Sequence, residues 1–291
     1  MSDNLKGAIF MMCSMTCFAV NDAMIKALGG VLPMFQTVAL LGVMVLLLLG
    51  LVVALSGWNV QKLGSRDKWI LGLRALAEVG AAFFNVTALF NMELANVNTI
   101  LQILPLAIPL FAYIVLGEPL GWRRTIAIGV GFLGMLLIIK PGGEGFNIYS
   151  IFCLAAVVCV TIRDVTARSL VAKLSSQEIS FFAALAVFVA GRCATFFEPW
   201  EDVSLDSWIL LTGPSVAIFF GYIVSVLAIR MGEVSFTAQF RYVGLLVTLV
   251  VGYIFFEEWP DTWSLIGSAG IVITGMFIFF RQGRKKGVID T

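Results

Sequence analysis

The sequence predicts an all-α integral membrane protein whose ten transmembrane helices form two inverted five-helix repeats. Three observations predict it: an apolar composition, a series of apolar segments of membrane-spanning length, and similarity between the two halves. Of the 291 residues, 60% are hydrophobic and 13% are charged, and the mean hydropathy is +0.98. Soluble domains carry about 25% charged residues, so a bilayer has to solvate much of this apolar surface.

Ten apolar segments have the length of a spanning helix, which is about 20 residues. The first follows Lys6 and runs to about Leu28 without a clear cleavage site, so it is interpreted as a membrane helix and not as a signal peptide. Short polar, proline or glycine turns separate the segments, and they leave no room for an aqueous domain. The predicted limits are 5–28, 33–56, 69–92, 97–117, 121–140, 148–170, 178–198, 207–230, 234–256 and 263–281.

The distribution of positive charge predicts the orientation. With the N-terminus inside, thirteen Lys and Arg residues fall on the cytoplasmic side, and Lys26 and Lys140 fall on the other. Cytoplasmic segments of membrane proteins carry this excess. We therefore expect a multi-pass protein of the cytoplasmic (inner) membrane with both termini in the cytoplasm.

Similar residues recur in the same order in residues 1–142 and 143–291. Asp22 and Lys26 in the first segment match Asp164 and Arg168 in the sixth, at one constant offset. A repeat of five helices is odd, so the second copy has to lie inverted, a plan typical of carriers with a binding site near midplane. Further matches join Met92, Leu106, Glu118 and Trp122 to Met231, Leu245, Glu257 and Trp263.

Two stretches carry a family resemblance. ANVNTILQILPLAIPLFAYIVLGEPLGW (95–122) and FRYVGLLVTLVVGYIFFEEWPDTW (240–263) resemble the signature of the drug/metabolite transporter superfamily, in its EamA-type branch. NDAMIK (21–26) and RDVTARSL (163–170) resemble carriers of S-adenosylmethionine and riboflavin. The resemblance implies a central cavity, alternating access and no ATPase. The chain departs from the pattern at 38–44, where relatives often carry an arginine.

Other classes of function are disfavoured. The net charge of +1 gives no basic surface for nucleic acid, and the absence of histidine removes the commonest metal ligand. The five cysteines lie in apolar runs and are interpreted as small core residues. The G-x-G-x-x-G match at 129–134 lies inside a predicted span, where small residues permit close helix packing. We expect no catalytic residue, cofactor or metal site.

Ionisable residues inside spans are the first site candidates, since each costs about 2.5–3.5 kcal/mol at the bilayer centre. Glu78, Arg241, Arg163 and Asp164 either line a polar cavity or pair with one another for helix packing. Glu78 is also the candidate for a protonatable coupling group, with protons as a candidate coupling ion.

Two acid–base pairs lie four residues apart, Asp22 with Lys26 and Asp164 with Arg168. This spacing favours an ion pair along a helix. The pairs are interpreted as stabilisers of helix ends, and the alternative is a symmetric pair of gate elements.

A group of amides forms the principal site candidate. Asn98 and Gln102 share one helix face beside Pro105 and Pro109, which free backbone carbonyls at membrane depth. A simple helix kink is the alternative. Phe83, Phe84, Phe240 and Tyr242 are expected to stack on a heterocycle. The predicted substrate-binding residues are Glu78, Asn85, Asn98, Gln102, Tyr222, Gln239, Arg241 and Tyr242.

These features favour a secondary active transporter of a small organic metabolite. The resemblance places an S-adenosylmethionine-like or riboflavin-like heterocycle ahead of exported amino acids or drugs. The partners are then the solute and the lipid bilayer, and the carrier is a monomer or a homodimer. The competing class is a membrane enzyme or assembly factor for lipid-linked substrates, and a channel is a third alternative.

Overall fold

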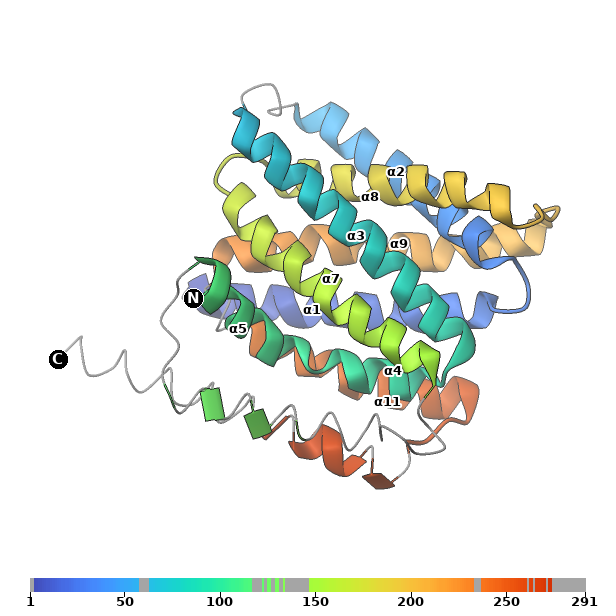
Figure 1. Cartoon of the computed structure of the whole chain (residues 1–291). Helices are drawn as coiled ribbons and strands as arrows, with labels where there is room; N and C mark the ends of the chain where they lie inside the picture. The colour runs from blue at the N-terminus through green and yellow to red at the C-terminus, as the bar shows by residue number, and fades with distance from the viewer. Residues whose placement is uncertain are drawn as a thin grey trace.

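The computed structural model describes residues 3–57, 63–116, 147–232 and 237–260, with short stretches at 122, 125–126, 129–130, 133, 262–263, 265–270 and 272–273. Helices make up its regular structure (Figure 1). Among the described residues, six helices are long and apolar enough to cross a membrane. They are α1 (Asp3–Leu28), α2 (Met34–Ser56), α3 (Ser65–Asn91), α7 (Ile148–Leu170), α8 (Ser176–Ala194), continued by η2 (Thr195–Phe197), and α9 (Leu205–Met231).

The predicted span 97–117 is two helices, α4 (Leu94–Leu101) and α5 (Leu104–Leu116). They are separated at Gln102 and Ile103, just before Pro105, whose nitrogen cannot donate the hydrogen bond that would continue the helix. The predicted span 234–256 begins with the short η3 (Ala238–Arg241) and continues as α11 (Tyr242–Phe256). The predicted spans 121–140 and 263–281 lie largely outside the described residues.

Helices from the two halves pack in pairs. α1 packs along α9, α3 along α7 and α2 along α8, and these are the most extensive helix contacts of the described structure. Figure 1 shows α3 and α7 side by side across the front of the bundle. Let α1, α2 and α3 of the first half correspond to α7, α8 and α9 of the second. When each helix is exchanged for its counterpart, the pair α1–α9 becomes the pair α7–α3, and the pair α2–α8 stays the same. Such symmetry is what two duplicated halves produce.

Glycines let α2 and α8 approach each other closely. A Cβ atom on Gly42 would lie 2.8 Å from the Cα of Phe188, and one on Gly191 would lie 2.9 Å from the backbone nitrogen of Ala39. Close backbone approach through small residues is a common way for helices to associate in lipid. These two glycines therefore fix the distance between the two halves at this contact.

The polarity of the bundle is that of a membrane protein. Leu47, Leu51 and Leu55 on α2 are 61–80% exposed, whereas Arg74 and Glu78 on α3 are at most 4% exposed. Lipid solvates the apolar exterior, and the charged groups lie where they contact each other. Charged side chains are therefore buried in the interior of the bundle, where they can contribute to a binding site.

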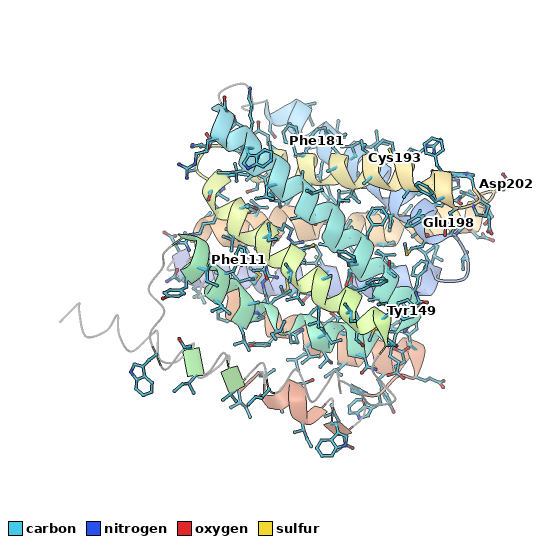
Figure 2. All side chains as sticks on the ribbon, in the orientation of Figure 1. Phe111, Tyr149, Phe181, Cys193, Glu198 and Asp202 are labelled. Atoms are coloured by element: carbon cyan, nitrogen blue, oxygen red, sulfur yellow. The ribbon has the colours of Figure 1, made fainter. Side chains whose placement is uncertain are left out.

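The acidic segment after α8 caps α2 at one end of the bundle. The carboxylate of Glu198 accepts hydrogen bonds from the backbone N–H groups of Met34 and Phe35, at 3.2 and 2.8 Å. An anion is favourable at a helix N-terminus, where the N–H groups have no partner inside the helix. Figure 2 shows Glu198 and Asp202 beyond the end of α8. This segment of the second half thus holds the start of α2.

Candidate functional site

A central cavity of about 170 Å³ lies between the helices of the two halves. That volume is room for roughly ten waters, the scale of a small organic molecule. The described residues of α1, α3 and α4 contribute to its wall, and so do those of α7, α9 and η3. Its polar lining residues are Asn21, Asp22, Glu78, Asn85, Asn98, Gln102, Arg163, Tyr222 and Arg241.

Glu78 connects three helices at one end of this cavity. Its Oε1 atom lies 3.2 Å from Nη1 of Arg163 on α7 and accepts a hydrogen bond of 3.1 Å from the Tyr222 hydroxyl on α9. Its Oε2 atom lies 3.6 Å from Nη1 of Arg74, one turn earlier on α3. The alternative that these charged residues pair with one another for helix packing therefore applies in part, since Glu78 and Arg163 form an ion pair. Both still line the cavity.

Asp164 extends this network to the second half's η3. Its carboxylate accepts a hydrogen bond of 2.9 Å from Nε of Arg163 and another from Nη2 of Arg241. Three guanidinium groups thus face two carboxylates, those of Glu78 and Asp164. Counted at full charge, this end of the cavity has one positive charge in excess. We call these five side chains the arginine cluster.

Asp22 lies at the other end of the cavity, among amides. Its Oδ1 atom accepts hydrogen bonds from Nδ2 of Asn85 at 3.2 Å and of Asn21 at 3.4 Å. Asp22 is 6% exposed and lines the cavity. The described residues provide no salt bridge to it. A cationic ligand would therefore supply the countercharge that this buried carboxylate lacks among the described residues.

The structure therefore corrects the two expected i,i+4 ion pairs. Lys26 binds Glu258, with Nζ 2.7 Å from Oε1, and also donates to the Met92 carbonyl at 2.8 Å. Asp164 binds Arg163 and Arg241, whereas Arg168 lies exposed in the last turn of α7. Other partners thus outweigh the i,i+4 spacing in both cases, and the Asp22 carboxylate is left to line the cavity.

The amides of α4 lie at the break between α4 and α5. Asn98 donates to the Leu94 carbonyl at 3.4 Å, and Gln102 donates to the carbonyl of Asn98 at 3.3 Å. Both are buried and line the cavity, as does Asn85. The break thus coincides with the cavity wall, which is where irregular backbone is tolerated at membrane depth.

The expected aromatic stack is not assembled from the residues that the sequence suggested. Phe83 packs on Phe35, with ring centroids 5.5 Å apart, and Phe84 packs on Phe152 at 5.8 Å. Tyr242 belongs to the hydrophobic core. None of Phe83, Phe84, Phe240 and Tyr242 is among the described residues that line the cavity, where Phe18 and Tyr222 supply the aromatic rings. The side chain of Gln239 lies outside the described residues.

Three contributors were missed by sequence reasoning. Arg74 lies four residues before Glu78 and so on the same helix face, a signal that could have identified it. Asn21 adjoins Asp22 in sequence and contacts it. Phe18 lies beneath the guanidinium of Arg163, 5.9 Å from the ring centroid to Cζ, and its position one helical turn before Asp22 was the available signal.

The chemistry of this site is that of binding. Among the described residues, no group of three or more His, Cys, Asp or Glu side chains could hold a metal ion. The cavity combines guanidinium donors, carboxylate and amide acceptors, and an apolar wall. Such a site can hold a polar organic solute away from lipid.

The chain is similar to known transporters over most of its length. The model of a family described as the EamA-like transporter family matches residues 5–140 and 147–281. A Rickettsia bellii protein named S-adenosylmethionine uptake transporter is 27% identical, over 97% of this chain and 97% of its own length. A Pseudomonas aeruginosa protein named pseudopaline exporter is 24% identical over 92% and 93%.

Two further matches say less about function, one because it is partial and one because its sequence identity is low. A Vibrio cholerae protein named riboflavin transporter is 25% identical over 61% of each chain. A solved structure, titled only as the crystal structure of a protein, matches with a TM-score of 0.72 and 19% identity over 97% of this chain and 99% of that one. The latter supports the fold alone.

Proposed function

This chain belongs to the EamA-like transporter family, and from that premise we propose that it is a secondary active transporter that moves a small organic metabolite by alternating access. Its family is one of transporters, so it is not an enzyme. The proposal includes ten transmembrane helices in two inverted repeats, 1–142 and 143–291, with both termini in the cytoplasm. The two matched segments and the symmetric pairing of helices support two equivalent halves.

One observation carries the proposal: the cavity is lined by charged groups from both halves. Glu78 comes from the first half, and Arg163 and Arg241 come from the second. When two halves move against each other, a site built from both can be exposed to either side in turn. Glu78, Asn85, Asn98, Gln102, Tyr222 and Arg241 are the proposed binding residues.

For the substrate we propose an S-adenosylmethionine-like heterocycle. The full-length match to a protein named for uptake of that compound supports it, as does the combination of arginine, carboxylate and amide groups. A riboflavin-like heterocycle is the second candidate, supported by a partial match. The match to a protein named pseudopaline exporter supports export as the alternative direction, and exported amino acids or drugs are the other alternative.

The contact of Lys26 with Glu258 is proposed to close one end of the pathway. It joins α1 of the first half to the segment after α11, and Glu258 also accepts a hydrogen bond of 2.8 Å from the Leu94 N–H. The two side chains are 16% and 17% exposed. An ion pair in this position can break and re-form as the halves move, because it is not deeply buried.

Counterflow in reconstituted vesicles tests the function. Vesicles loaded with unlabelled S-adenosylmethionine or riboflavin should accumulate the labelled compound through wild-type protein in a saturable manner. Arg241→Gln should abolish accumulation, and Arg192→Gln should not, because Arg192 contacts Phe196 and Trp200 away from the cavity. Equal accumulation by the wild type and Arg241→Gln would contradict the proposed site, and chemical conversion of the solute would contradict transport.

A further inference from the structure

The polar groups of the cavity are divided between two places. Glu78 and Asn85 both lie on α3 and are seven residues apart, so they share one helix face and are separated by about 10 Å along the axis. Glu78 belongs to the arginine cluster, with its excess of positive charge. Asn85 belongs with Asp22 at the other end, where the described residues provide no countercharge.

Unsatisfied atoms at the Asp22 end are all acceptors. Oδ1 of Asn21 and Oδ1 of Asn85 are buried and find no hydrogen-bond partner among the described residues. The Nδ2 groups of Asn21 and Asn85 already donate to Asp22, so these carbonyl oxygens point elsewhere. A buried acceptor without a donor costs about 1–3 kcal/mol, and a cationic ligand would remove that cost at each of them.

In the arginine cluster, Nε of Arg241 and Nε of Arg74 are buried donors without a hydrogen-bond partner among the described residues, while Nη2 of Arg241 binds Asp164. Oε2 of Glu78 is an acceptor without a hydrogen bond, but it faces Nη1 of Arg74 at 3.6 Å. Arg241 lines the cavity and is 5% exposed. An anionic group is the ligand that a free guanidinium N–H and an excess positive charge favour. Burial strengthens both preferences, since little solvent screens the charges.

We propose that the cavity selects a zwitterionic solute whose anionic group binds at Arg241 and whose distal cationic group binds at Asp22. This rests on the proposed function and adds to it the charge and polarity of the substrate. Asp22 is then the cation-recognising residue, and the side-chain carbonyl groups of Asn21 and Asn85 complete its acceptor shell. A solute with one of the two charges would leave the other end unmatched, and so would bind more weakly.

The test measures charge preference in each variant. Competition against counterflow of labelled S-adenosylmethionine compares S-adenosylmethionine itself with S-adenosylhomocysteine, which lacks the sulfonium charge, and with decarboxylated S-adenosylmethionine, which lacks the carboxylate. A second series against labelled lysine compares lysine with norleucine, which lacks the ε-ammonium group, and with cadaverine, which lacks the carboxylate. Wild-type protein should prefer the member that carries both the carboxylate and the distal cation at least about tenfold, as expected for a hydrogen bond to a charged group.

Each variant should erase one preference and keep the other. In Asp22→Asn, compounds with and without the distal cation should compete equally well, and compounds without the carboxylate should still compete less well. In Arg241→Gln, loss of the carboxylate should no longer weaken competition, and loss of the distal cation should still weaken it. Asp22→Glu should retain the cation preference, which separates recognition from folding. Asp67→Asn and Arg192→Gln are matched controls outside the cavity and should behave as the wild type.

Three results would overturn parts of the account in different ways. Transport without any charge preference would overturn the two-ended site and leave the carrier function standing. Loss of affinity for every compound by the same factor in Asp22→Asn and Arg241→Gln would assign both residues to folding and would also overturn the site. Failure of wild-type protein to transport either labelled compound would overturn the zwitterion proposal, and riboflavin counterflow in the same vesicles would show whether the carrier function survives.

Discussion

Glu78 of α3 and Arg163 of α7 form a buried ion pair between the two halves of the bundle, with 3.2 Å between Oε1 and Nη1. The pair joins helices whose sequences are far apart, and it lies at the wall of the central cavity. A buried pair of this kind is weak evidence for net stability, but breaking it leaves a charge uncompensated. It therefore provides the first test of the arrangement.

Removing the charge of Glu78 should destabilise the protein and stop transport. Glu78→Gln leaves Arg74 and Arg163 without their common partner, and removal of one member of a buried pair costs about 3–5 kcal/mol. The measurement is unfolding of purified protein in detergent, combined with counterflow. Asp67→Asn is the control, because Lys173 in that pair is 51% exposed, and its loss should cost less than about 1 kcal/mol. Equal effects of the two substitutions would contradict the assignment.

Asp164 and Arg241 should prove energetically coupled. Asp164→Asn and Arg241→Gln each leave a buried charge without its partner, so the double variant should lose less than the sum of the two single losses. The interaction free energy from a double-mutant cycle of unfolding should be about 1–3 kcal/mol. Additive losses would mean that the two side chains do not pair in the membrane-embedded protein.

Charge reversal tests the proposed closure of the pathway. Lys26→Glu and Glu258→Lys should each slow counterflow at least about tenfold, since either one replaces an ion pair by two neighbouring like charges in the closed state. The combination Lys26→Glu with Glu258→Lys restores opposite charges and should recover much of the rate. Wild-type rates in both single variants would show that this contact is not part of the transport cycle.

The close contact of α2 with α8 should be intolerant of a methyl group. Gly42→Ala places a Cβ 2.8 Å from the Phe188 backbone, and overpacking of this kind costs about 1–3 kcal/mol. Gly72→Ala on α3 is the matched control, because nothing lies within 4 Å of its Cβ position. The melting temperature should fall for Gly42→Ala and stay unchanged for Gly72→Ala. The opposite ranking would place α2 and α8 farther apart.

Much of the fold could be predicted because lipid imposes a simple rule of length and polarity. The predicted segment 148–170 is α7, and the limits of α2 and α9 differ from prediction by at most two residues. The break before Pro105 follows from the chemistry of proline, which removes a backbone donor. The spans at 121–140 and 263–281 remain predictions, because the described residues cover them only in part.

The sequence predicted several of the polar residues that line the cavity. It did not predict which side chains contact one another. Glu78, Gln102 and Arg241 line one cavity, as their cost in lipid suggested. Their partners depend on the rotation of each helix about its axis and on neighbours distant in sequence. Hence Lys26 binds Glu258 in place of Asp22, and Phe83 packs on Phe35 away from the cavity. A single sequence does not encode these relationships in its spacing.

Water access to Asn85 distinguishes a hydrated binding cavity from a packed polar core. A single cysteine in place of Asn85, in protein whose five native cysteines have been replaced by serine or alanine, would be treated with a membrane-impermeant thiol reagent from each side of sealed vesicles. We expect labelling that slows when S-adenosylmethionine or lysine saturates the carrier, because the cavity that Asn85 lines is hydrated and binds the solute. Absence of labelling from both sides would contradict it, since the charged and amide groups would then be sealed in a packed core.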